Sequence, residues 1–509
     1  MARIQLLGGS YKQAAFIAGV QNCINLYPEK NPQTAQSPVG ITHYPRPGNT
    51  PLGAPPNPGS GRGLYVSSLG DFYAFVGQSV YWVDPNWVFH DVGNVLINAL
   101  TPIYGSDNGV TAIIVDGSPF GYRIILAAGA SGTFSQLADP NYLGATRCDF
   151  LDYFLVFNEP GTPNWYCTQE SSDIFNALFF GTKTAWPDNI ITLITCERQA
   201  WLLGKYKSEI WSNAGTVPFP FQILSGNIVE HGTVSAYAVA KQDVNVYWLS
   251  ESPEGARLAM RGALQQATRI STHAIEDEWL KYPRVDDCII QTYQMRGHAF
   301  VEYHFPTADR CWVFDEATQE WHEKATYDQN GVQHRPADLF KAYAYGKNVA
   351  QDWRTGQLYL IDETNYTDNG APILMERSMP HVQDEQEFNR LTVWRLIADM
   401  EIGSGTGVAI PTAERPWSLG FNPGFGPNQL VTPPQVSLYV SRDRGASFQA
   451  HSDQPLISTQ GDIPYYNVKP TFNRCGQAYD FVFRLRWSGP LQTALDSVFI
   501  TTEVSEGDS

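Results

Sequence analysis

The chain has 509 residues and a formal net charge of −17, because 51 acidic side chains outnumber 34 Lys and Arg. A generic nucleic-acid-binding protein gains affinity by neutralising phosphates, so this charge balance argues against that class. Charged residues make up 17% and aromatic residues 13% of the chain, which also contains 43 Gly and 34 Pro. This composition is poor for helical bundles and typical of sheets joined by tight turns.

Residues 1–62 are predicted to form an extended arm. Nine prolines fall between Pro28 and Pro58, with glycines among them. Such a segment cannot run as a helix or as a central strand, so we expect a strap over the surface. Neither a signal peptide nor an apolar stretch long enough to span a bilayer is recognisable, and no membrane association is expected.

Residues 63–365 are predicted to form a β-propeller. Short apolar strands separated by Gly, Asp and Asn turns recur in units that start near 63, 111, 147, 191, 233, 288 and 340. A spacing of about 40–55 residues is typical of propeller blades, and a ring of blades buries both faces of each sheet. We expect six or seven blades, of which the last is the least complete.

One helix is expected at 271–282, where Ser271 or Thr272 can cap the N-terminus and Glu276 lies in an early turn. It is predicted to decorate the edge of a blade.

Residues 366–509 are predicted to form a C-terminal β-sandwich. Their strands, which start near 391, 435, 479 and 496, are longer and alternate apolar with polar residues. Between the first two lies a loop at 403–435 with six Gly and six Pro. A structureless loop of this length is usually functional or disordered.

No catalytic, metal-binding or cofactor-binding motif is recognisable, and none of these sites is expected. The seven cysteines include no C-x-x-C pair and are interpreted as buried thiols of a protein that folds in a reducing cytoplasm. Carboxylates at Glu276–Glu278 and Asp286–Asp287 lack the D-x-D-x-D-G spacing of a calcium loop. A carboxylate pair facing a propeller funnel, as in a glycosidase, stays open as an alternative.

The stretch SRDRGASF (441–448) matches the S-x-D-x-G-x-x-F pattern of the Asp-box turn. In that pattern Ser441 and Asp443 hold a turn together at Gly445, and the aromatic Phe448 packs beneath it. We interpret the single copy as a turn staple that carries no chemistry.

Two stretches, RISTHAIEDEWLKY (269–282) and GHAFVEYHFPTADRCWVFDEATQEWHEK (297–324), resemble a recurrent signature of the packaged-DNA stabilisation proteins. These are the tail hub or nozzle proteins of short-tailed bacteriophages (podoviruses). The N-terminal segment around Gln21–Glu29 and the stretch 434–445 also resemble this family. The signature positions are Ser271, Thr272, His273, Glu276, Gly297, His298, Phe305, Pro306, Trp312, Asp315, Trp321, His322 and Glu323.

The resemblance implies a virion structural protein, not an enzyme, that assembles in the host cytoplasm. It implies a homo-hexameric ring below the tail adaptor that bears spikes or fibres and is closed by a needle or plug. Double-stranded DNA would pass during genome ejection without sequence-specific binding, and head completion would depend on the ring. The alternative hypothesis is a glycan-binding or glycan-cleaving propeller of a tail spike.

Overall fold

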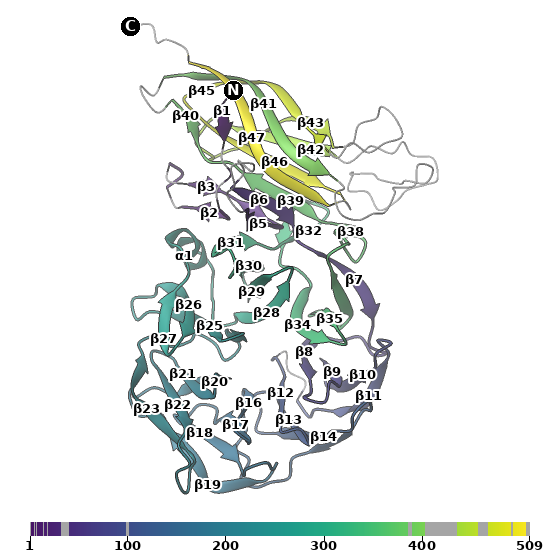
Figure 1. Cartoon of the computed structure of the whole chain (residues 1–509), viewed down its shortest axis with the longest axis vertical. Coiled ribbons are helices and arrows are strands. Elements are labelled where there is room, and N and C mark those ends of the chain that lie inside the picture. Colours follow the sequence, from purple (N-terminus) through teal and green to yellow (C-terminus); the bar gives the residue numbers. More distant parts are fainter. Residues whose placement is uncertain are drawn as a thin grey trace.

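The computed structural model describes residues 2–504 apart from positions 5, 7, 14 and 18 and the segments 32–39, 98–100, 385–388, 403–434, 457–466 and 490–491. This part of the chain forms strands and one helix, α1 (His273–Leu280), and that helix is not long or apolar enough to cross a membrane. A ring of four-stranded sheets carries a β-sandwich on one side of its rim (Figure 1). The predicted all-β class and propeller are therefore confirmed.

The ring has seven blades, each an antiparallel sheet numbered from its inner to its outer strand. Blade 1 consists of β8 (Gly61–Val66), β9 (Phe72–Val76), β10 (Ser79–Val83) and β11 (Phe89–Asn94), and blade 2 of β12 (Tyr104–Asp107), β13 (Thr111–Val115), β14 (Gly121–Ile125) and β15 (Thr133–Gln136). Blade 3 consists of β16 (Cys148–Leu151), β17 (Phe154–Asn158), β18 (Asn164–Thr168) and β19 (Phe175–Thr182). Blade 4 consists of β20 (Ile190–Cys196), β21 (Gln199–Gly204), β22 (Ser208–Asn213) and β23 (Phe221–Val229). Blade 5 consists of β24 (Val239–Gln242), β25 (Asn245–Glu251), β26 (Arg257–Ala263) and β27 (Gln266–Arg269). Blade 6 consists of β28 (Ile289–Met295), β29 (His298–Phe305), β30 (Arg310–Asp315) and β31 (Glu320–Glu323). Blade 7 consists of β34 (Asp338–Ala344), β35 (Lys347–Asp352), β36 (Leu358–Asp362) and β7 (Gly48–Gly53).

The N-terminal segment closes this ring. Blade 7 draws only three strands from its own stretch of sequence, and β7 pairs antiparallel with β36 as the fourth. The inner strand β34 then contacts β8 of blade 1, as each inner strand contacts the next around the ring. The unit that looked least complete in the sequence is therefore a full blade, completed by a strand from about 300 residues earlier in the chain.

Apolar side chains from facing blades interlock to form the core of the ring. Between blades 3 and 4, for example, Trp165 and Trp211 lie edge to face with ring centroids 5.5 Å apart. Strands with both faces buried in this way read as short continuous apolar runs. These apolar runs allow the blades to be predicted from the sequence.

The second domain packs two sheets around its own apolar core, which includes Leu396, Phe483 and Val498. One sheet contains β44 (Asn467–Val468), β41 (Leu391–Ile402), β47 (Thr493–Val504), β6 (Ile41–Pro45) and β5 (Leu26–Lys30), with β1 (Ala2–Ile4) and β45 (Thr471–Ala478) at its sides. The other contains β39 (Leu374–Ser378), β46 (Asp480–Ser488), β42 (Gln435–Ser441), β43 (Gln449–Pro455) and β40 (Val382–Gln383).

The N-terminal segment was expected to form a surface strap, but its strands pair with strands of both domains. β1 pairs with β47, and β5 and β6 form a hairpin in the sandwich. β4 (Cys23–Ile24) lies parallel to β31 of blade 6 and antiparallel to β39, so one sheet of ten strands runs from the propeller into the sandwich. The prolines misled the prediction because an edge strand such as β5 tolerates them.

Small elements complete the described chain. A hairpin of β2 (Tyr11–Lys12) and β3 (Val20–Gln21) contacts α1, and β32 (Thr326–Tyr327) pairs with β33 (Gln333–His334). β37 (Thr367–Asp368) pairs with β7 and with β38 (Ala371–Pro372). The predicted loop at 403–435 lies outside the described residues except for Gln435, which begins β42.

The close packing of β7 against β37 predicts a cost for a side chain at Gly48. A Cβ atom there would lie 2.3 Å from the carbonyl oxygen of Thr367, a backbone atom that cannot move aside cheaply. We expect Gly48→Ala to lower the free energy of unfolding by roughly 1–3 kcal/mol, measured by urea denaturation. Gly59→Ala is the matched control, since its Cβ would meet nothing closer than 3.5 Å. Equal stability of the two variants would contradict the close packing of β7 against β37.

Candidate functional site at the junction of the two domains

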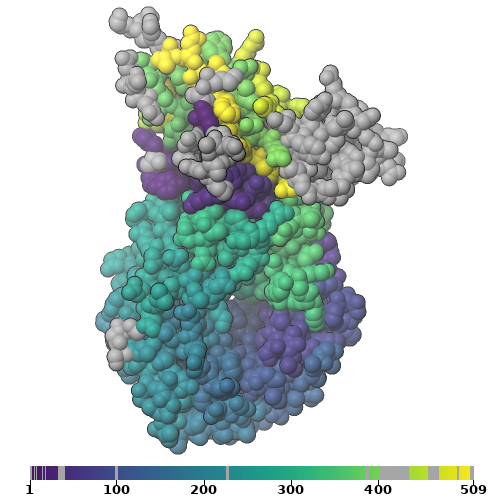
Figure 2. Space-filling model, in the orientation of Figure 1, coloured from purple at the N-terminus to yellow at the C-terminus, as the bar shows by residue number. Residues whose placement is uncertain are grey.

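The predicted signature residues gather where the propeller meets the sandwich. Four of them begin α1, and the others lie in or beside blade 6, whose outer strand continues through β4 into the second domain. In Figure 2 the purple N-terminal segments fill the space between the teal blades and the yellow-green sandwich. The signature therefore marks the junction of the two domains.

The start of α1 differs from the predicted capping. Thr272 occupies the N-cap position, but its side chain makes no capping hydrogen bond. Ser271 Oγ instead accepts a hydrogen bond from the Ala259 amide at 3.1 Å and donates to Glu276 at 2.5 Å. Arg269 Nε also donates to Glu276, at 2.6 Å, while the exposed His273 ring lies 2.9 Å from the same guanidinium. The acidic residue of the first turn thus fixes the helix to blade 5 through Arg269.

Aromatic side chains join α1 to blade 6. Trp312 Nε1 donates to the Tyr282 hydroxyl at 2.9 Å, and Trp321 Nε1 donates to the Ile270 carbonyl at 2.9 Å. The Phe305 ring lies 5.4 Å from Trp279 of the helix, and the half-buried Pro306 follows at the end of β29. The helix is therefore part of the core between blades 5 and 6, where we had expected only a decoration of a blade edge.

The contact between His298 and Asp315 links β29 to β30 in blade 6. Gly297 takes the left-handed conformation (φ +82°) that the turn before His298 requires. The His298 Nδ1 atom lies 2.8 Å from Asp315 Oδ2, and Thr318 Oγ1 donates to the same oxygen at 2.7 Å. The hydrogen bond with Asp315 raises the pKa of His298. All these groups hold strands together.

The polar contacts of β4 centre on Asn25, which is fully buried and left-handed (φ +58°). Its amide donates to the Glu323 carbonyl at 2.8 Å, and its side chain donates to the Ala325 and Leu374 carbonyls, one from each domain. Arg46 Nε donates to the Asn25 side chain at 2.8 Å and forms an ion pair with Asp368. Asn25 lies in the segment Gln21–Glu29, which resembles the family, but nothing in the sequence predicted its central place.

A buried cluster of four charges joins blade 6 to blade 7. Lys324 Nζ lies 2.8 Å from Glu302 and 2.6 Å from Asp338, and Lys341 Nζ lies 3.2 Å and 2.7 Å from the same two carboxylates. Burial alone would raise the pKa of Glu302 and Asp338, but the two ammonium groups hold both pKa values well below the usual range. Two cations thus balance two anions in the core, which no spacing in the sequence indicated.

Within the described chain, Glu302, His304 and Cys311 bring three possible metal-ligand atoms within 4.8 Å of one another. Glu302 is already shared by both ammonium groups, and its Oε2 lies 2.9 Å from His304 Nε2. Burial lowers the pKa of His304 and raises that of the Cys311 thiol, so both are held neutral. A divalent cation would have to compete with the two lysines, and the donor set fits an ion-pair cluster better than a metal site.

Glu323 borders a polar cavity of about 150 Å³ between α1, the N-terminal segment and blade 6. Gln333 donates a hydrogen bond to its carboxylate, Arg310 lies 3.7 Å away, and Glu278 of the helix lines the same cavity. Burial raises the pKa of Glu323 to about 7. The neighbouring His322 faces the core, and burial lowers its pKa to about 4. As the pH rises, His322 therefore loses its proton before Glu323, which is the reverse of the order for free histidine and glutamate side chains.

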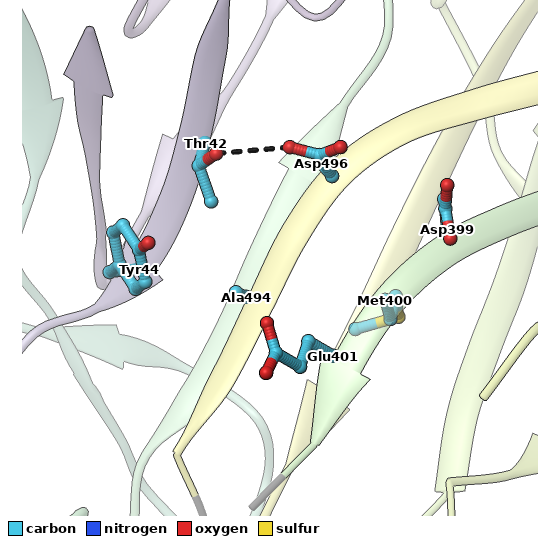
Figure 3. Close-up of a pocket in the computed structure, with 7 residues that line it drawn as sticks. All are labelled: Thr42, Tyr44, Asp399, Met400, Glu401, Ala494 and Asp496. Atoms are coloured by element: carbon cyan, nitrogen blue, oxygen red, sulfur yellow. Dashed lines mark hydrogen bonds between the residues drawn. The ribbon is translucent and has the colours of Figure 1, made fainter. Parts of the chain in front are cut away.

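A second, open pocket of about 440 Å³ lies on the larger sheet of the sandwich (Figure 3). Asp399 and Glu401 of β41 and Asp496 of β47 line it, and Thr42 Oγ1 donates to Asp496 at 3.0 Å. Desolvation and repulsion by Asp399 raise the pKa of Asp496. These carboxylates lie on the sandwich and not in the propeller funnel, where the glycosidase alternative needs its acids.

The other carboxylates considered from the sequence each serve a local contact. Asp287 accepts the Thr307 amide at 2.7 Å, Asp286 pairs with Arg284, and Glu278 pairs with Lys281. They form no common ligand set among the described residues.

The motif at 441–448 forms a hydrogen-bonded turn. Ser441 Oγ donates to Asp443 at 2.6 Å and accepts the Gly445 amide at 2.7 Å, with Gly445 at φ +89°. The Ser447 amide donates to Asp443 at 2.9 Å. Phe448 stacks under the Arg484 guanidinium at 3.6 Å. Every group of the motif is used to hold the turn.

A family model described as "Bacteriophage P22 Gp10, beta-propeller" matches residues 3–366. No curated protein matches the sequence. Among solved structures, the extracellular domain of a putative one component system from B. thetaiotaomicron aligns with TM-score 0.40 and 10% identity over 62% of this chain and 39% of that chain. BamB from Moraxella catarrhalis aligns with TM-score 0.38 and 9% identity over 67% and 97% of the two chains. Virginiamycin B lyase from Staphylococcus aureus aligns with TM-score 0.38 and 9% identity over 59% and 94%.

The buried charge cluster predicts a large effect of removing one cation. Lys324→Met leaves Glu302 and Asp338 to share Lys341, and we expect a loss of about 3–5 kcal/mol in the free energy of unfolding by chemical denaturation. Lys281→Met, which breaks the exposed pair with Glu278, is the control and should cost less than about 1 kcal/mol. A similarly small loss for both variants would contradict a structural role of the cluster.

Glu323 predicts a fall in stability towards neutral pH. Its pKa in the folded protein, about 7, lies above the ordinary 4.5, so the folded state keeps the proton longer than the unfolded state. The free energy of unfolding should therefore decrease as pH rises from about 4.5 to 7, by up to roughly 3 kcal/mol. Glu323→Gln should remove this part of the pH dependence in thermal unfolding. The prediction fails if wild type and variant change in parallel over that range.

Proposed function

This chain belongs to the family of the bacteriophage P22 Gp10 β-propeller, and we propose that it is the hub or nozzle of a short-tailed phage tail. In this role it forms a homo-hexameric ring below the tail adaptor, extends the ejection channel and helps retain the packaged genome. It anchors spikes or fibres, and a separate needle or plug completes the closure.

The observation that carries this proposal is the span of the family match. Residues 3–366 include every strand of the propeller and the β4 segment that connects the propeller to the sandwich. The family is one of phage structural proteins, which agrees with the way the signature residues are used. Asp315, His298, Trp312 and Trp321 all serve packing and hydrogen bonding inside the junction.

We propose further that the protein is not an enzyme. Each carboxylate of the charge cluster is ion-paired and fully buried, which suits a rigid scaffold and not general acid–base chemistry. The charge of the whole chain also bears on the channel. A surface rich in Lys and Arg would hold phosphates and slow ejection, whereas an acidic surface repels the duplex at short range. Retention is then steric, through ring closure and a plug.

Particles lacking this protein should fill with DNA and then lose it. We expect genome loss during storage, measured as DNA released from purified heads. We also expect the purified protein to show no measurable duplex binding near physiological salt in a filter-binding or anisotropy assay.

Stable, full heads without the protein would contradict the retention role. Tight, salt-sensitive duplex binding would contradict the steric mechanism while leaving the position in the tail open to direct imaging.

A further inference from the structure

The outer rim of blades 3 and 4 carries no charge. Residues 174–182, which include β19, and residues 210–229, which include β23, contain no ionisable side chain, although charged residues make up 17% of the chain. Large apolar side chains are nevertheless exposed there: Val217 at 93%, Leu178 at 62% and Phe180 at 50%, together with Ile223 and Ile228. We call these five residues the rim patch. In Figure 1, β19 lies at the end of the molecule away from the sandwich, and β23 lies along the adjoining side of the ring.

The rim patch is continuous with the core beneath it. The Cα of Gly181 lies so close to Phe219 that a Cβ there would meet the ring at 2.7 Å, so β19 and the turn that carries Val217 lie side by side. Phe219 in turn packs 5.0 Å from Trp165 and 5.4 Å from Phe221. Apolar surface thus extends outward from the blade 3–4 core.

The other outer strands are polar, short or covered. β11 exposes His90 and Asp91, and β15 and β27 have four residues each. In blade 6, β31 is covered by β4, and in blade 7 β7 is paired with β37. Blades 3 and 4 instead have outer strands of eight and nine residues with no further strand partner among the described residues.

We propose that the rim patch is a contact surface for a second copy of this chain, an inference that rests on the ring proposed above. The occupant follows from charge. Two copies that each carry −17 repel one another wherever their acidic surfaces meet, and an uncharged surface lets them make contact without that repulsion. DNA or a basic partner would gain nothing from this surface. Nineteen described residues of the two uncharged segments are exposed or half-buried, close to the roughly 20–30 residues that form one side of a standard interface.

The outer strands also limit how the contact forms. The register of β19 shifts opposite Tyr166–Thr168, and that of β23 shifts opposite Glu209–Trp211. Bulges of this kind disrupt the row of backbone groups that would let strands add edge to edge without end. The contact is therefore made by side chains and not by the addition of strands edge to edge.

The test measures self-association of the full chain by light scattering and mass photometry over a range of concentrations. The rim variant is Leu178→Ser with Phe180→Ser, and a second, independent variant is Ile223→Ser with Ile228→Ser. The control is Val244→Ser with Leu280→Ser, which removes two comparably exposed apolar side chains outside the rim patch. Thermal unfolding of each variant establishes that it is folded.

We expect the wild type and the control to associate alike, and each folded rim variant to need at least about tenfold higher concentration to associate. Added salt should leave association unchanged or strengthen it, since it screens repulsion between acidic copies. The proposal is overturned if the wild type stays monomeric, if both folded rim variants associate like the wild type, or if salt dissociates the complex. If particles lacking the protein leak DNA while the rim variants associate normally, the proposed function stands and the rim contact fails. If such particles keep their DNA, the retention role fails whatever the rim variants show.

Discussion

The exposed edges of β-sheets are the constraint on which this structure depends. An outer strand leaves a row of unpaired backbone groups, which must be covered or blunted. Here one N-terminal segment covers three such edges: β1 pairs with β47, β4 with β31 and β7 with β36. The same few residues therefore close the ring, complete the sandwich and join the two domains. We infer that neither domain has an intact outer surface without this segment.

The charge cluster adds to the apolar contacts between blades 6 and 7, where Tyr293, Phe300 and Ile361 belong to one buried apolar cluster. Glu302 and Lys324 belong to blade 6 or its end, whereas Asp338 and Lys341 belong to β34 of blade 7. Because each carboxylate contacts both ammonium groups, sliding one blade against the other would leave a buried charge uncompensated. The cluster lies next to the junction with the sandwich.

Much of this architecture could be predicted from the sequence because it depends on local patterns. The blades were visible as apolar runs between turn residues, and the long strands of the sandwich were visible through alternation. The N-terminal strands were missed because prolines argue against central strands and do not reveal edge strands. The charge cluster was missed because Glu302, Lys324 and Asp338 meet only through tertiary packing. Thr272 takes the N-cap position as predicted, but its side chain makes no capping hydrogen bond, and Ser271 binds the Glu276 carboxylate, which also binds Arg269.

The function depends on where the propeller sits in the particle, since a rigid, charge-balanced junction serves a tail hub and a peripheral spike equally well. A cryo-electron microscopy map of intact particles tests this most directly. The account predicts copies of a seven-bladed propeller in a closed ring around the DNA channel, below the tail adaptor. Density for the propeller only in peripheral appendages, away from the channel axis, would contradict it.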